Sequence, residues 1–298
     1  MVTDAPWSPA VPPEDDDDRE DRALIEQARA GSAGALEALV RRHQAFVFNV
    51  AVRMVYCPQD AEDATQEILI KLVTKLSTFE GRSRFRTWLY RIATNHLLNM
   101  KRGRVEAGAM TFSDYGRSLD ETPDLDIPDS REMPIDSKLF LEEARIACTS
   151  AMLLCLDREQ RLAYVLGEIL GLTDVVAGEI LELSREAFRQ RLARARRDLH
   201  SFLNDKCGLM NKGNPCRCAK KARGFMQAGY IDPQNLLFAG ERVRLVREVA
   251  PARSSAADGY DELGGEIYRS HPYYEPKDLA ARVREVVESS AFRDTFEV

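Results

Sequence analysis

The segment from Gly81 to Arg104 contains seven basic side chains and no acidic one, although the 298-residue chain has a formal net charge of −6. Three large aromatic residues, Phe85, Trp88 and Tyr90, stand among these arginines. Basic side chains neutralise phosphates, and aromatic rings stack on unpaired bases at about 1–3 kcal/mol per base. This combination indicates binding of single-stranded or distorted nucleic acid.

A helical period divides the side chains of this segment between two roles. Phe85 and Trp88 fall on its apolar face, so we expect them to pack in a core. The polar side chains that face away are better placed to contact base edges: Arg86, Asn95 and Asn99. The preceding loop, FEGRSR at 79–84, can offer a pocket for a base extruded from a duplex.

Residues 173–199 have the layout of a helix-turn-helix. Thr173 and Ser184 are expected to cap its two helices. A recognition helix reads base edges with its N-terminal residues and holds phosphates further along. The candidate DNA contacts are the cap of the second helix and its outward polar side chains: Ser184, Arg185, Glu186, Arg189, Gln190, Arg194 and Arg197.

Charge is segregated along the chain. Besides 81–104, the segments 185–197 and 204–224 each carry six basic residues and one acidic residue, whereas 14–21 and 114–136 are strongly acidic. Concentrated basic stripes are typical of proteins with a polyanionic partner. Solvated helix faces remain the alternative explanation for any one stripe.

Apolar residues recur with a helical period along most of the chain, and no segment alternates like a strand, which predicts an all-α protein. We expect two helical domains joined by an acidic flexible linker, with a partly helical C-terminal extension. The predicted boundaries are a disordered acidic N-terminus at 1–21, a first domain at 22–106, the linker at 107–136, a helix-turn-helix domain at 137–204, a cysteine-containing basic segment at 205–240 and a tail at 241–298.

Several classes of protein are disfavoured. No run of eighteen apolar residues predicts a membrane span, and the N-terminus does not resemble a signal peptide, so we expect a cytoplasmic protein without a membrane partner. No phosphate-binding glycine loop, paired-histidine metal motif or nucleophile elbow is found, so we do not expect an enzyme.

Three cysteines, Cys207, Cys216 and Cys218, have the spacing C-x8-C-x-C among lysines and glycines. No cofactor is required by the other motifs, but three thiolates here could hold Zn²⁺ with a fourth ligand from elsewhere, and His200 is the nearest candidate in sequence. A redox pair, or a basic loop that touches DNA, is equally compatible with this spacing.

The motifs DAEDATQEILIKL and FEGRSRFRTWLYRIATNHLLNMKR, followed after an acidic linker by the helix-turn-helix, resemble the extracytoplasmic-function (ECF) group of the main bacterial sigma factor family. The resemblance covers about residues 22–204 and implies a region 2 bundle, a region 4 helix-turn-helix and binding of core RNA polymerase and promoter DNA. It implies that the polymerase contacts Asp60, Asp63, Gln66 and Glu67, and that the minus-ten element contacts Phe79, Arg82, Ser83, Arg86, Asn95 and Asn99. The helix-turn-helix would read the minus-thirty-five element.

About 95 residues follow the part that resembles this family. An anti-sigma factor, or inhibition of the sigma domains by this tail in cis, is therefore an expected form of regulation. The alternative function is a helix-turn-helix regulator that binds DNA but not core polymerase. Such a regulator has no reason to carry the 60–104 module.

Overall fold

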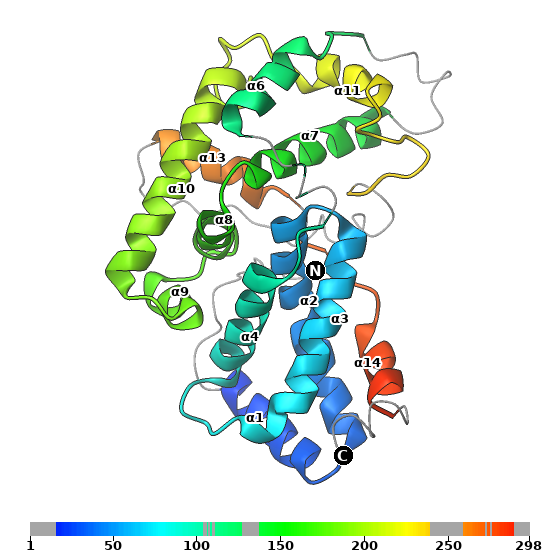
Figure 1. The fold of residues 1–298 in the computed structure, drawn as a ribbon, viewed down its shortest axis with the longest axis vertical. Helices are drawn as coiled ribbons and strands as arrows, with labels where there is room; N and C mark the ends of the chain where they lie inside the picture. The colour runs from blue at the N-terminus through cyan, green and yellow to red at the C-terminus, as the bar shows by residue number, and fades with distance from the viewer. Residues whose placement is uncertain are drawn as a thin grey trace, which may run out of the picture.

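The computed structural model describes residues 16–103, 106, 108, 111–126, 137–238, 259–271, 273–274 and 276–288. Within these ranges the chain is helical and has no strand, which confirms the predicted all-α class. Figure 1 shows two groups of helices, one built mainly from residues 16–99 and the other mainly from residues 112–227. None of the described helices is long and apolar enough to cross a membrane.

The first group is a four-helix bundle of α1 (Asp16–Arg29), α2 (Ala33–Val55), α3 (Pro58–Lys75) and α4 (Phe85–Asn99). Helix α2 is its central element, and Leu39, Val47 and Val50 on it are fully buried. Proline suits the first turn of α3, where its missing N–H is not needed. The N-cap residues are Cys57 for α3 and Arg84 for α4, and neither side chain accepts a capping hydrogen bond.

The predicted disordered N-terminus is too long, because residues 16–21 form the start of α1. Asp21 is fully buried, and its carboxylate lies 2.8 Å from Arg42 Nε and 3.1 Å from His43 Nε2. Burial alone would raise the pKa of Asp21, but the hydrogen bond to His43 and the nearby arginines hold it below its usual value. These partners of Asp21 are distant in sequence, so the acidic run alone does not indicate the helix. Residues 1–15 lie outside the described part.

The second group contains α7 (Ser137–Leu154), α8 (Arg158–Tyr164), the π-helical turn η2 (Val165–Ile169), α9 (Asp174–Leu181) and α10 (Arg185–Lys206). Phe140, Tyr164 and Leu199 are fully buried in its core. Helix α10 packs against both α8 and α9, which fixes the helix-turn-helix on the rest of the group.

The predicted flexible linker is partly wrong, because residues 112–121 form helix α6. Thr111 caps this helix by accepting a hydrogen bond from the N–H of Asp114 at 3.2 Å. The rings of Phe112 and Tyr115 pack against Phe202 on α10, with centroids 5.2 and 6.0 Å away. Two aromatic residues about one turn apart therefore tie this part of the linker to the second group.

The C-terminal extension forms α11 (Cys218–Gln227), α13 (Gly259–Arg269) and α14 (Leu279–Glu288). These helices confirm the expected partly helical extension. Figure 1 shows α11 and α13 beside the second group and α14 beside the first, against α2 and α3. The extension therefore contacts both groups of helices.

A buried cluster of charges also joins the two groups. Glu106, 2% exposed, receives hydrogen bonds from Arg158 at 2.7 and 2.5 Å and from Arg161 at 3.0 Å. Burial would raise the pKa of Glu106, but the two arginines lower it, so the carboxylate stays ionised. Arg158 also donates to the carbonyl oxygens of Leu98 and Met100, which holds the end of α4 against the start of α8.

Candidate polymerase and nucleic-acid interfaces

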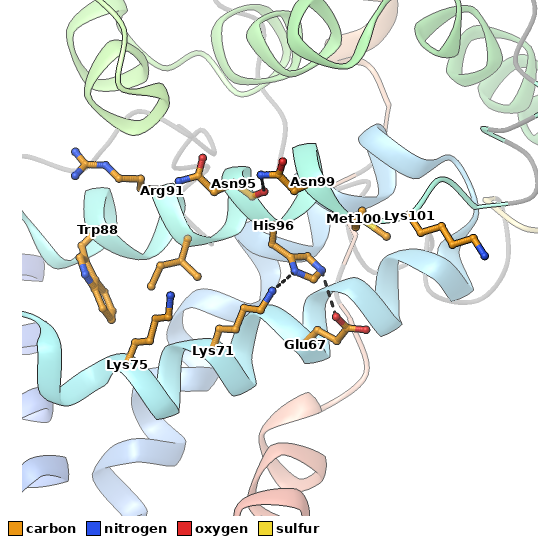
Figure 2. A pocket seen from close by; sticks show the side chains of 11 residues that line it. Glu67, Lys71, Lys75, Trp88, Arg91, Asn95, His96, Asn99, Met100 and Lys101 are labelled. Atoms are coloured by element: carbon orange, nitrogen blue, oxygen red, sulfur yellow. Dashed lines mark hydrogen bonds and ion pairs between the residues drawn. The ribbon is translucent and has the colours of Figure 1, made fainter. Parts of the chain in front are cut away.

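A hollow of about 690 Å³ lies between α3 and α4. Figure 2 shows that Trp88 and His96 point from α4 toward α3, while Arg91, Asn95 and Asn99 lie on the other side of α4. The charged side chains around the hollow are mostly basic: Lys71, Lys75, Arg91 and Lys101, with Glu67 as the acid. Cations beside exposed amides and an aromatic ring can hold a phosphate chain with unpaired bases.

His96 connects the two walls of this hollow. Its Nδ1 lies 2.5 Å from Lys71 Nζ, and its Nε2 lies 3.6 Å from the Glu67 carboxylate. Burial and then the Lys71 ammonium lower the pKa of His96, against the opposing effect of Glu67. A neutral ring can accept from Lys71 at Nδ1, which fixes this lysine beside α4.

A second hollow, of about 370 Å³, lies at the loop 79–84 where a base pocket was expected. Ser83 and Arg84 line it on the loop side, and Arg22 and Arg29 line it from α1. The arginines from α1 were not found by sequence reasoning, because helical periodicity does not show that α1 packs beside this loop.

The six residues predicted to contact the minus-ten element do not share one surface. Asn95 and Asn99 are exposed on α4, and Arg82 is exposed and paired with Glu80 at 2.6 Å. Ser83 lines the second hollow. The interpretation of Arg86 as outward-facing is wrong, because α1 covers that face and Asp21 lies 3.6 Å from the Arg86 guanidinium.

Phe79 also differs from expectation. Its ring is 8% exposed and packs edge-on against Phe85, with centroids 5.4 Å apart, and tilted against Trp88 at 5.3 Å. This aromatic cluster is part of the core, as was expected for Phe85. Phe79 therefore forms part of the wall of the second hollow, and its ring is not exposed for stacking on a base.

Four polar residues on α3 were predicted to contact the polymerase. Asp63 and Glu67 are exposed one turn apart, and Asp60 and Gln66 are half-buried. This acidic stripe lies on one face of α3, so the structure brings these four residues together.

The helix-turn-helix is formed by α9 and α10, as predicted. Thr173 accepts from the N–H of Val176 at 3.4 Å and Ser184 accepts from the N–H of Ala187 at 3.1 Å, which confirms both caps. The outward residues are all exposed: Arg185, Glu186, Arg189, Gln190, Arg194 and Arg197. Helix α10 continues to Lys206, seven residues beyond the predicted end.

Asp174, in the first helix of this motif, has contacts that sequence reasoning missed. Its carboxylate forms ion pairs with Arg185, at 3.5 Å, and with Arg189. Two predicted DNA-binding arginines are thereby paired with α9 while both remain exposed.

Helices α4 and α9 are in direct contact, which places the predicted minus-ten helix against the helix-turn-helix. Arg91 donates to the carbonyl oxygen of Glu179 at 3.0 Å, and its guanidinium lies 3.4 Å from the Glu182 carboxylate. The side of α4 that carries Asn95 therefore faces the second group of helices (Figure 2).

The described part of residues 259–288, hereafter the strap, connects the two groups from the opposite end of the chain. On the second group, Arg269 pairs with Glu168, and Gly264 lies so close to His200 that a Cβ would collide with its ring. On the first group, Asn49 and the backbone of Tyr274 exchange two hydrogen bonds, at 2.8 and 2.9 Å. Between them, His271 lies 2.6 Å from the Thr149 hydroxyl.

Comparisons with known proteins cover about 60% of the chain. Residues 39–106 match the profile of sigma-70 region 2. RNA polymerase sigma-H factor of Pseudomonas aeruginosa is 29% identical over 192 residues, spanning 62% of this chain and 94% of that relative. ECF RNA polymerase sigma-E factors of Haemophilus influenzae and Escherichia coli are 31% and 30% identical, spanning 59% of this chain and 91% and 90% of theirs.

Among solved structures, CnrH in complex with the cytosolic domain of CnrY aligns with a TM-score of 0.44 and 25% identity, covering 62% of this chain and 98% of that chain. The sequence relationship extends over nine-tenths of the sigma-E relatives, and the residues that match sigma-70 region 2 include α3 and α4. The chain belongs to the ECF RNA polymerase sigma factor family.

Proposed function

We propose that this sigma factor binds core RNA polymerase through the acidic stripe on α3 and holds promoter DNA at two elements, without catalysing a reaction itself. The observation that carries this proposal is the α3–α4 hairpin, where lysines, exposed asparagines and an aromatic ring surround one hollow beside the acidic stripe. A DNA-binding regulator that does not contact polymerase has no use for that hairpin.

The two DNA-binding elements cannot both be engaged in the arrangement described here. Elements centred near minus ten and minus thirty-five are separated by about 25 base pairs, or roughly 85 Å along B-DNA. In this structure α4 and α9 are in contact through Arg91 and Glu179. The groups must separate before a promoter can be bound at both positions, so this arrangement is a closed one.

The strap is the element that favours the closed arrangement. It reaches Glu168 and Thr149 on one group and Asn49 and Arg41 on the other, so separation of the groups must break one set of these contacts. The strap therefore acts as an inhibitor in cis, in the role that an anti-sigma factor would have in trans.

Run-off transcription with core polymerase tests both parts of the proposal. The chain should direct core enzyme to promoter fragments, and weakening the strap should increase that activity. Promoter binding of equal affinity with and without core polymerase would instead favour the helix-turn-helix regulator. Loss of transcription in an Asn95→Ala variant, with normal core binding, would support the α4 assignment.

A further inference from the structure

Helix α1 contacts the loop between α3 and α4, although it lies outside residues 39–106, the part that matches sigma-70 region 2. It packs against α4 and against η1 (Leu76–Thr78), the short 3-10 helix that follows α3. The second hollow, of about 370 Å³, lies between α1 and the loop. This volume is within the range of about 300–1,000 Å³ that is usual for small-ligand pockets.

Arg29, in the last turn of α1, holds the start of this loop. Its guanidinium donates to the carbonyl oxygen of Leu76 at 2.9 Å and to the carbonyl oxygen of Phe79. Because the donor is charged, these hydrogen bonds are stronger than those between neutral groups. Arg29 therefore fixes the backbone from which the loop departs.

The other end of the loop is also held by α1. The Asp18 carboxylate lies 3.4 Å from the guanidinium of Arg84, the N-cap residue of α4. Between these two tethers, Gly81 has a φ of 72°, in the left-handed region that favours glycine, and a Cβ there would meet no atom within 4 Å. The loop thus turns between two fixed ends, and its shape depends on α1.

The charges around the second hollow differ from those around the first. Four cations and one carboxylate line the first hollow. Three arginines and three carboxylates line the second: Arg22, Arg29, Arg84, Asp18, Glu26 and Glu80. A phosphate chain is held by an excess of cations, whereas a nucleobase is neutral and offers both donors and acceptors on its edge. The first hollow therefore suits the phosphate chain, and the second suits a single base.

We propose that Arg29 is a positioning residue for promoter opening, because it fixes loop 79–84 so that the second hollow can hold one unpaired base of the melted strand. This inference rests on the proposed function, since it concerns the same DNA. Arg22 and Glu26, one turn apart on α1, and the Ser83 hydroxyl line the hollow and supply donors and acceptors for the edge of the base.

Binding of forked DNA by the holoenzyme tests this role. The probe is a fork with an unpaired non-template strand, selected from a random pool by the wild-type chain with core polymerase and then made with single abasic sites. At one position the wild type should prefer the intact base by at least about fivefold, the lower end for hydrogen bonds to one base. Arg29→Ala should lose most of that preference. Gln27→Ala, exposed on the same helix and outside the lining of the hollow, should keep it.

The preference for the intact base separates positioning from a general loss of structure. A destabilised fold would weaken binding to intact and abasic DNA equally and leave their ratio unchanged. An unchanged ratio in Arg29→Ala, or no position at which the wild type prefers a base, overturns the proposal. A wild-type holoenzyme that selects no DNA would instead refute the proposed function and this inference with it.

A second variant does not depend on how Arg29→Ala folds. Asp18→Asn keeps the size of the side chain but removes the charge that pairs with Arg84. It should lower the preference for the intact base in the same direction, by less than Arg29→Ala does. A wild-type preference in Asp18→Asn would show that the hollow does not depend on α1 and would overturn the proposal.

Hydrogen exchange of the free chain tests the tether without DNA. The Phe79 N–H donates to the Leu76 carbonyl at 3.3 Å, and this is one of the two carbonyls that Arg29 holds. The Phe79 amide should therefore exchange faster in Arg29→Ala than in the wild type or in Gln27→Ala. Equal exchange in all three proteins would refute the role of Arg29 in fixing the loop.

Discussion

Replacing Asn49 by alanine should release the strap from the first group of helices. Asn49 is fully buried on α2, where its Nδ2 donates to the Tyr274 carbonyl at 2.8 Å and its Oδ1 accepts from the Tyr274 N–H at 2.9 Å. Alanine is a good helix former, so α2 itself should persist. The substitution therefore acts on the docked strap more than on the bundle.

The magnitude follows from the two backbone groups left without a partner. A buried donor or acceptor without a hydrogen bond costs about 1–3 kcal/mol, so the pair costs about 2–6 kcal/mol as long as Tyr274 stays docked. Since 1.4 kcal/mol is a factor of ten, docking should weaken by at least about 30-fold. Asn49 also accepts from Arg53 at 2.8 Å, which adds to this cost.

Hydrogen exchange and transcription report the result together. In Asn49→Ala, amides of residues 273–285 should exchange faster, and run-off transcription per bound core polymerase should rise. The control is Arg41→Ala on the same helix, because the exposed ion pair of Arg41 with Asp278, at 2.8 Å, is worth at most about 1 kcal/mol. Faster exchange with unchanged transcription would refute inhibition by the strap, and unchanged exchange would refute the docking argument.

Three further predictions concern the interfaces and the dependence on pH. Charge reversal at Asp63 and Glu67, both exposed, should leave the melting temperature nearly unchanged and reduce co-purification with core polymerase; wild-type co-purification would contradict the α3 assignment. Asn95→Ala should slow promoter melting in permanganate footprints more than it weakens duplex binding, whereas Arg194→Ala should weaken binding to all sequences and reduce the salt slope by about one. Burial, then Arg53 and Arg145, hold the pKa of His271 well below 6.5, so the folded strap binds fewer protons than the unfolded chain, and its docking should be fully stable above pH 6.5 and weaken as pH falls below it. Hydrogen exchange at pH 7.5 and 5.5 should show that loss in the wild type and less of it in His271→Gln.

Local signals in the sequence were sufficient for much of the fold. Thr173 and Ser184 precede helices whose first-turn amides they cap, and this pattern is readable within four residues. The partly helical nature of the extension likewise follows from apolar residues one turn apart, such as Leu279 and Val283 on α14. For the same reason, the exposed face of α10 and the position of Asn95 on α4 were predicted correctly.

Contacts between distant residues were not predictable in this way. Asp21 looks like part of a solvated acidic run until Arg42, His43 and Arg86 are placed around it. Asn49 has nothing in its own helix to indicate Tyr274, which lies 225 positions away. Helical periodicity gives the face of a side chain but not the element that covers it, which is why Arg86 was expected to face outward although Asp21 of α1 lies beside it.

In the closed arrangement, the acidic linker forms hydrogen bonds and an ion pair with the basic segment of the extension. Lys221 holds Thr122 and Asp124, and the N–H of Leu125 donates to the Lys220 carbonyl at 2.9 Å. Residues 122–126 therefore cannot lie on α11 and also extend between two separated groups of helices. Because Lys221 is 8% exposed, salt screens its interactions less than it screens ion pairs on the surface. Release of the linker therefore requires Lys221 to break its contacts with Thr122 and Asp124. Under the proposed inhibition in cis, opening is coupled to the extension at two places, the strap and α11, so a signal that acts on either one must overcome the other before the two groups of helices can separate.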